Sequence, residues 1–561
     1  MISRIFRVVN RGWQGMHEAA ILLGVFSLVS QLIGLFRDRM LASMIGPSST
    51  LDIYYAAFRI PDLLYLSVAS LASITVLMPF IIERLNKNGK ESARKFFNDV
   101  FSGFLILLVF VCGIVFIFMP SISHMIAPGF NVQELHTLVG VSRIMLLSPI
   151  LLGLSGLVGT ITQILRKFIV FSLSPIFYNL GLIAGIVFLY PRFGVYGLAV
   201  GVVVGALLHL LIQLPTIIAA GFTPSLSRRI EKASLRKLIM LSLPRTIGLS
   251  MNSISLLVIV ALASTVGAGS VSIFNFSINL ETTPVGIIGL SYAIASFPLL
   301  AETFARGDME GWKKSIFSAT RQILFWSLPL TTLFIVLRAQ IVRITLGAGA
   351  FSWTDTKLTA ACFAIFSIGL IGQNLVLVSV RAFYSAHDTK TPLIINTLCS
   401  IIIVGLAYGL LHVFAVVPAF RNCVESLLRV QNTPGTAVLM LPLAYSIGTL
   451  LNAWLHWLDL RRRYINVNGG VVKAFYQSLI SALVLGVVSY VVLNALAPIF
   501  GMTTFLGVLG QGFFAGLAGT CASVVVLYAF KNEEFFNLIS ALRQKFWKTN
   551  LIDPDQVPSG E

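Results

Sequence analysis

The sequence predicts an all-α polytopic membrane protein with about 14 transmembrane helices. Of its 561 residues, 57% are hydrophobic and only 11% are charged, and its mean hydropathy is +0.89. A soluble core of this size could not bury so much apolar surface. Windows of about 20 mostly apolar residues recur along the chain, each long enough to cross about 30 Å of hydrocarbon as a helix. Such continuous runs exclude a β-barrel, whose strands alternate over about ten residues.

The predicted spans follow these apolar windows in order. They cover residues 20–42, 52–82, 98–119, 135–160, 168–190, 194–219, 239–265, 270–300, 315–337, 359–385, 391–416, 435–457, 473–494 and 504–530. Ahead of them, residues 1–19 predict an interfacial helix, because Arg4, Arg7 and Arg11 alternate with apolar residues. Residues 531–561 are expected to form a cytoplasmic tail that begins with a second interfacial helix.

Basic residues predict the orientation of the chain. On this segmentation, the termini and the even-numbered loops carry 26 of the 40 Lys and Arg residues, the odd-numbered loops carry 6, and the spans carry 8. Lys and Arg accumulate on the cytoplasmic side of a membrane. Both termini are therefore predicted to be cytoplasmic. The segment 416–435 is then an unusually long outward loop.

The formal charge of +18 follows from this topology and needs no nucleic acid to explain it. The basic clusters lack interleaved aromatic residues, which argues against a nucleic-acid partner, and they suit the headgroups of anionic membrane lipids. The five cysteines have no metal-like spacing. No phosphate loop, zinc pattern or dinucleotide fingerprint appears. We expect no metal site, no cofactor and no enzyme activity, while coupling to an ion stays open.

The chain contains an internal repeat. Leu-Ala-Ser followed by Gly occurs at 41–46 and again at 262–267, and Pro, Glu, Gly and a basic pair recur in the same order after Pro79 and Pro298. The offset of 218 to 221 residues equals about six spans, so the two copies have the same orientation. Parallel repeats with a substrate site between them are one plan of secondary transporters. The predicted parts are an N-lobe of spans 1–6 (20–219), a cytoplasmic basic linker (220–238), a C-lobe of spans 7–12 (239–457) and spans 13–14 (458–530).

Ionised side chains lie inside the first two predicted spans, at Arg37, Asp38, Asp52 and Arg59. A charge near the bilayer centre costs about 2.5 to 3.5 kcal/mol on insertion scales, so it normally faces a protein-lined cavity and meets a partner or a substrate. Arginine suits an anionic visitor, because its planar fork binds phosphate oxygens in pairs and keeps its charge when buried. These residues predict a cavity that receives an anion.

Several of these segments resemble a known family. They are similar to segments of the MurJ/MviN lipid II flippases at Gly34–Ala42, Gly46, Asp52, Ala57–Leu64, Ala127–Phe130 and Arg381–Pro392. The resemblance covers nearly the whole chain. It implies the fold of the MOP flippase superfamily, with two six-helix lobes and here two C-terminal helices around a central cationic cavity. It also implies a substrate of undecaprenyl diphosphate carrying a peptidoglycan precursor, in a bacterial inner membrane.

The chain departs from that family where arginines are expected. Tyr65 and Leu66 stand in place of two arginines, and Gln31 and Asn279 each stand in place of one. Residues 68–73 also lack the family's acidic stretch. The charged residues of the first two spans remain.

The candidate substrate-binding residues are assigned from these charges. We expect Arg37 and Arg59 to clamp the diphosphate, with Asp38 and Asp52 holding the arginines in place. Three residues in spans four, seven and eight are candidates for further lining: Arg143, Arg245 and Glu281.

Alternative interpretations stay open for these residues. The run Arg37 to Arg39 also fits a salt-bridged cap at the membrane surface, and Arg59 a packing role. Arg143 and Arg245 fit side chains that extend to an interface. Glu281 fits a carboxylate satisfied within the bundle.

The predicted function is a flippase that moves lipid II from the inner to the outer leaflet by alternating access. Its partners would be the lipid-linked substrate and membrane lipids, with cell-wall synthesis proteins as candidates. Two alternatives remain, namely an exporter of another polyprenyl-linked glycan or amphipathic cation, and a non-transporting membrane scaffold of the same fold.

Overall fold

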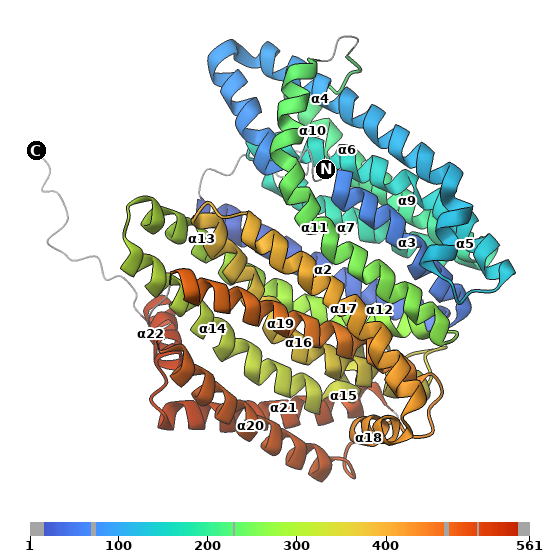
Figure 1. Cartoon of the computed structure of the whole chain (residues 1–561), viewed down its shortest axis with the longest axis vertical. Coiled ribbons are helices and arrows are strands. Elements are labelled where there is room, and N and C mark those ends of the chain that lie inside the picture. The colour runs from blue at the N-terminus through green and yellow to red at the C-terminus, as the bar shows by residue number, and fades with distance from the viewer. Residues whose placement is uncertain (1–15, 69–73, 228–230, 465–469, 502–503, 548–561) are drawn as a thin grey trace, which may run out of the picture. The chain divides into compact units, whose positions relative to one another are not determined.

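The computed structural model describes residues 16–68, 74–227, 231–464, 470–501 and 504–547, and these ranges contain helices and no β-strand (Figure 1). The all-α prediction is therefore confirmed. The predicted interfacial helix at 1–19 lies almost entirely outside the described residues.

The helices follow one another with short connections. Their bounds are α2 (Met16–Met44), α3 (Ser49–Val68), α4 (Ile74–Ile126), α5 (Val132–Met145), α6 (Leu147–Ile164), α7 (Phe168–Ala184), the π-helix η2 (Gly185–Leu189), α8 (Tyr190–Phe193), α9 (Val195–Leu211), α10 (Leu214–Ala219), α11 (Lys232–Val266), α12 (Ser270–Ile287), α13 (Gly289–Ala305), α14 (Met309–Val336), α15 (Arg338–Leu346), α16 (Trp353–Ser385), α17 (Lys390–Val416), α18 (Pro418–Leu428), the 3-10 helix η3 (Thr436–Leu439), α19 (Met440–Arg463), α20 (Val471–Leu496), α21 (Phe505–Ala529) and α22 (Glu533–Trp547).

Within the described part of the chain, 11 helical stretches are long and apolar enough to cross a membrane. They coincide with 11 of the predicted spans, so the chain is a multi-pass membrane protein. Of the remaining predictions, 20–42 and 239–265 fall on α2 and α11, whereas 52–82 covers most of α3 and the beginning of α4. The predicted spans 20–42 and 52–82 contain the charged residues of interest, which lower their mean hydropathy. In α11, the apolar part is the shorter stretch Ser250–Val266. The count of 14 stays a prediction.

Two segments that were expected to lie at membrane surfaces contain helices. The long segment 416–435 includes α18, which begins at a proline and has no buried residue. The predicted tail includes α22, whose Glu534 is buried and forms an ion pair of 2.6 Å with Arg321 of α14.

The chain forms two compact units. Unit 1 comprises Met1–Pro284, Ile341–Gly372 and His387–His456, and unit 2 comprises the rest. In unit 2, Trp312 packs in an apolar cluster with Phe383 and Leu460, and its Nε1 donates a hydrogen bond to Ser385 Oγ at 2.9 Å. Unit 1 holds the candidate site and is described further below.

Glycines bring α7 and the following η2 into close contact with α9 in unit 1. A Cβ added to Gly181 would lie 2.3 Å from Gly205 Cα, and one added to Gly185 would lie 2.6 Å from Gly201 Cα. Small residues let membrane helices approach at backbone distance. This contact fixes the position of α7, which carries the pocket residue Tyr178.

Two contacts in unit 1 repeat the internal symmetry of the sequence. The backbone N of Gly129 donates to Ser264 Oγ at 3.1 Å, and the backbone N of Ala350 donates to Ser43 O at 2.8 Å. Ser43 and Ser264 are equivalent in the repeat at an offset of 221 residues, and Gly129 and Gly349 at an offset of 220. Gly349 also lies against Ser43, since a Cβ added to it would be 2.2 Å from Ser43 O. The predicted N-lobe and C-lobe thus touch reciprocally, at the end where the basic-residue pattern predicts the outer surface.

Gly129 leaves no room for a side chain in this contact. A Cβ there would lie 2.2 Å from Ser264 O, which real Cβ atoms do not tolerate. We expect Gly129→Ala to separate the outer ends of the lobes, because the helix ends must move apart to relieve the clash. Spin labels at Met44 and Ala268, in a background without native cysteines, measure that separation. Gly113→Ala, which meets no atom within 4 Å, is the matched control, and an unchanged distance in Gly129→Ala would contradict the role of this contact.

Candidate functional site

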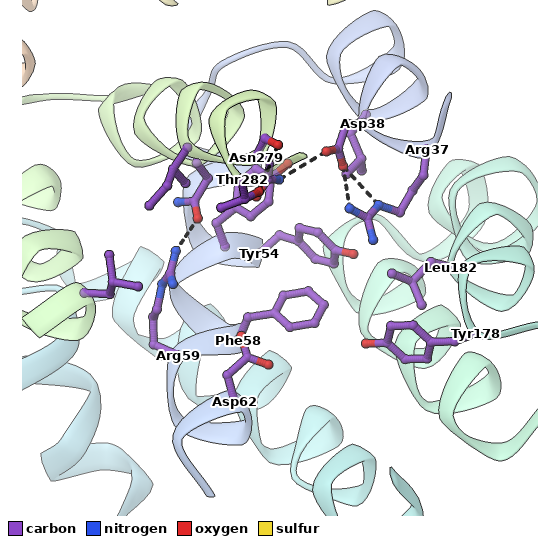
Figure 2. Close-up of a pocket in the computed structure, with 15 residues that line it drawn as sticks. Arg37, Asp38, Tyr54, Phe58, Arg59, Asp62, Tyr178, Leu182, Asn279 and Thr282 are labelled. Atoms are coloured by element: carbon purple, nitrogen blue, oxygen red, sulfur yellow. Dashed lines mark hydrogen bonds and ion pairs between the residues drawn. The ribbon is translucent and has the colours of Figure 1, made fainter. Parts of the chain in front are cut away.

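A pocket of about 260 Å³ lies within unit 1, lined by side chains of α2, α3, α7, α11 and α12 (Figure 2). Its charged lining residues are Arg37, Asp38, Arg59 and Asp62. Polar groups that complete its wall are Tyr54, Tyr55, Tyr178, Asn275, Asn279 and Thr282. The pocket therefore gathers both predicted clamp arginines and one of the two aspartates that were expected to hold them.

Arg37 is fixed by partners on two helices. Its Nε and Nη2 donate to Asp38 Oδ1 at 3.0 and 2.7 Å, and its Nη1 donates to Asn179 Oδ1 of α7 at 3.1 Å. Asp38 Oδ2 accepts from Asn279 Nδ2 of α12 at 3.1 Å. Figure 2 shows Asp38 between Arg37 and Asn279. The carboxylate thus links α2 to α12 and orients the guanidinium at the pocket wall.

Arg59 of α3 also contacts α12. Its Nη2 donates to Asn275 Oδ1, and Asn275 Nδ2 donates to Val271 O at 2.7 Å, which fixes the direction of the amide. The buried Nε of Arg59 has no hydrogen-bond partner among the described residues. The guanidinium is therefore only partly satisfied by the protein, which leaves it able to bind an anion.

Asp52 lies outside the pocket lining, and its partners differ from the arginine that was expected. Its carboxylate accepts from Gly269 N at 2.6 Å, from Ser272 N at 2.7 Å and from Ser272 Oγ at 2.5 Å. It is only 1% exposed and is not part of the pocket lining. An aspartate in this position satisfies the unpaired N–H groups at the start of a helix and interacts favourably with its dipole. Asp52 of α3 thus caps α12, a contact that joins the predicted N-lobe to the predicted C-lobe, and no arginine is among its hydrogen-bond partners in the described residues.

Arg143 is engaged away from the pocket, on α5. Its Nε donates to Phe116 O at 3.1 Å, and its guanidinium carbon lies 4.6 Å from the centre of the Phe116 ring. Phe116 precedes Pro120 by four residues in α4, and proline has no N–H to bond that carbonyl. Arg143 therefore compensates the carbonyl that Pro120 leaves without its helical donor.

Of the two remaining candidates, Glu281 is described by the structure and is not among the pocket-lining residues. Glu281 is fully buried, and it follows Asn279 by two residues on α12, which turns it about 200° around the helix from the pocket-lining face. Arg245 belongs to α11, and its side chain lies outside the described part of the structure.

Four residues stand where the resemblance leads us to expect arginines, and one of them, Asn279, has a clear role in the pocket. Asn279 lines the pocket and bonds Asp38. Tyr65 and Leu66 are exposed and are not among the pocket-lining residues. The Oε1 of Gln31 is buried and meets no hydrogen-bond donor in the described part of the chain.

Sequence reasoning missed Asp62 and Asn275. Asp62 follows Arg59 by three residues and so lies on the same helical face, a signal that was available from the spacing alone. Asn275 is an uncharged residue more than 200 positions away from its partner, and no local pattern marks it. With Asp62 included, the pocket is balanced in charge, with two arginines and two aspartates among the described lining residues.

The arrangement suits binding of an anion. Two guanidinium groups held from opposite ends of the pocket offer paired N–H donors to an oxyanion. The surrounding tyrosines and amides can donate further hydrogen bonds.

Comparison with known proteins places this geometry in context. The sequence model of the family described as lipid II flippase MurJ matches residues 41–509. A lipid II flippase MurJ of Burkholderia cenocepacia is 26% identical over 480 residues, which is 84% of this chain and 89% of that protein. A probable lipid II flippase MurJ of Buchnera aphidicola is 28% identical over 379 residues, or 66% of this chain and 74% of that protein.

Solved structures show the same fold. A lipid II flippase MurJ in an inward closed conformation superposes with a TM-score of 0.72 at 19% identity, covering 92% of this chain and 100% of that one. An inward-facing multidrug resistance transporter of the MATE family, from the MOP superfamily, superposes with a TM-score of 0.62 at 17% identity and covers 81% of this chain and 99% of that one.

Proposed function

The chain belongs to the lipid II flippase MurJ family, and we propose that it moves lipid II from the inner to the outer leaflet of the bacterial inner membrane, with Arg37 and Arg59 binding the diphosphate. The observation that carries this proposal is that Arg37 and Arg59 line the same pocket. A diphosphate is costly to remove from water unless cations and donors replace its hydration. Two oriented guanidinium groups supply that replacement.

The contacts of α12 support a mechanism of alternating access. Asp38 and Arg59 bond α12 from α2 and α3 at the pocket, while Asp52 caps the beginning of the same helix. The reciprocal contacts of Gly129 and Gly349 close the adjoining end. Breaking the contacts of Gly129 and Gly349 would open the pocket to the outer side. The prenyl tail would stay in lipid throughout.

The proposal also includes a driving force for transport and the partners of the protein. Moving one elementary charge through 100 mV is worth about 2.3 kcal/mol, so a membrane potential that is negative inside favours outward movement of the anionic diphosphate. We expect the protein to contact membrane lipids and to associate with cell-wall synthesis proteins, which would use the lipid II that it delivers.

Reconstituted vesicles test the proposal. Purified protein is inserted into vesicles that contain fluorescent lipid II, and a membrane-impermeant reagent reports which headgroups face outward. We expect headgroups to cross at least tenfold faster than in vesicles that contain the Arg37→Ala/Arg59→Ala variant. Equal rates in both preparations, and in vesicles without protein, would exclude flippase activity.

A further inference from the structure

Asp62 stands out among the pocket residues because it has no direct partner. It lines the pocket and is exposed to it, and within the described part of the chain no group donates a hydrogen bond or forms an ion pair with its carboxylate. Figure 2 shows it on α3 beside Phe58, with the hydroxyl of Tyr178 across the space in front. Asp38, in contrast, is saturated by Arg37 and Asn279.

An ionised Asp62 opposes the proposed ligand. The pocket contains two arginines and two aspartates, so a diphosphate with two negative charges would enter a site with no net positive charge among its described residues. Like charges in a partly dry site repel by several kcal/mol at close range. The pocket needs one further positive charge before it favours the diphosphate.

We infer that Asp62 binds a proton when the diphosphate enters the pocket, so that uptake of the lipid-linked headgroup is coupled to uptake of one proton. This inference rests on the proposed function. The proton transfers from water to the Asp62 carboxylate, and the resulting carboxylic acid can donate a hydrogen bond to a phosphate oxygen. Release of the headgroup on the outer side returns the proton to water there.

The geometry favours a proton over a metal ion. A metal ion prefers several oxygen or nitrogen ligands, whereas no group of three or more His, Cys, Asp or Glu side chains suited to a metal occurs in the described residues. The other pocket carboxylate, Asp38, is already occupied by Arg37. A proton needs only one oxygen and no coordination shell.

Other ionisable groups near Asp62 have to be separated from it in any test. The ionisable side chains that face the same pocket are those of Arg37, Asp38, Tyr54, Tyr55, Arg59 and Tyr178. Tyr65 lies one turn further along α3. His209 of α9 lies behind the wall, hydrogen-bonded to Ser155 Oγ at 2.7 Å and in edge contact with Tyr178.

The test measures the dissociation constant of a water-soluble, short-prenyl lipid II analogue between about pH 5.5 and 8.5. Its diphosphate is substituted at both ends and lacks the proton that a phosphate monoester releases near pH 6. For the purified full-length protein we expect affinity to fall by about tenfold per pH unit over part of this range, since one proton is bound with the ligand. In Asp62→Asn, which keeps the shape and removes the carboxylate, affinity should change by less than about threefold and exceed that of the unmodified protein at the alkaline end.

A matched control removes a carboxylate outside the pocket. Glu91→Gln changes an exposed residue that pairs only with Arg94, and it should keep the full pH dependence. If Asp62→Asn also keeps it, another group such as His209 takes up the proton and the inference fails. A dissociation constant that follows sodium concentration at fixed pH would equally overturn the proton assignment. A protein that binds no analogue at any pH would reject the proposed function itself, which is a different result.

Discussion

Arg37→Ala is expected to bind lipid II about 10- to 100-fold more weakly and to fail to replace the native flippase of a depleted bacterium, while still reaching the membrane. Each hydrogen bond from a charged group contributes about 1.5 to 3 kcal/mol. The guanidinium of Arg37 lines the pocket, and its hydrogen bonds to Asn179 and Asp38 hold it in place. Growth of the depleted strain and binding of purified protein are the two measurements. Arg59→Ala should behave in the same way.

The loss of Arg37 has two physical components, because it also leaves Asp38 with an uncompensated negative charge in the pocket. The double variant Arg37→Ala/Asp38→Asn separates them. If Arg37 binds the diphosphate directly, the double variant should remain defective. Full recovery would show that Arg37 only neutralises Asp38. Arg306→Ala, which changes an exposed arginine paired with Glu302, is the control for the substitution itself and should bind normally.

Asp52→Ala is expected to shift the protein toward conformations open at the outer end and to stop the transport cycle. The variant loses the three hydrogen bonds with which α3 caps α12, at a cost of about 2 kcal/mol. That cost corresponds to an approximately 30-fold change in the ratio of closed to open molecules. Spin labels at Met44 and Ala268 should show a longer distance, and transport in reconstituted vesicles should fall.

Two further variants make the interpretation of Asp52 specific. Ser272→Ala removes one of the three bonds and should shift the distance distribution less, in the same direction. Asp355→Ala removes a carboxylate that caps its own helix at Ser352 and joins no two lobes, so it should leave the distance unchanged. If Asp355→Ala opens the outer end as far as Asp52→Ala does, loss of a helix cap anywhere weakens the fold and the cap of α12 has no special role.

Much of the fold could be predicted because the bilayer imposes simple rules on sequence. Each long apolar window must be a helix in hydrocarbon, and 11 of the predicted spans coincide with apolar helices of the structure. The charged helices α2 and α3 were predicted from apolar windows in the same way, and the ionised groups inside them predicted a protein-lined cavity. Arg37 and Arg59 indeed line one.

The partners of individual residues could not be predicted, because they depend on contacts between distant segments. Asp52 meets α12 more than 200 residues away, so its role as a helix cap is invisible in its own neighbourhood. Arg143 bonds a carbonyl that Pro120 leaves without a donor, and only the packing of α4 against α5 reveals that pairing. Asp62 carried a local signal, its spacing of one turn from Arg59, but the structure was needed to show that its carboxylate is unpaired.

Native mass spectrometry of the purified protein tests most directly whether Arg37 and Arg59 hold a diphosphate. After gentle extraction in the presence of lipid II, the unmodified protein should retain one lipid II molecule, and the Arg37→Ala/Arg59→Ala variant should retain none while keeping its ordinary membrane phospholipids. Equal retention of lipid II by both proteins would contradict the account, because the two guanidinium groups would then contribute nothing to recognition of the substrate.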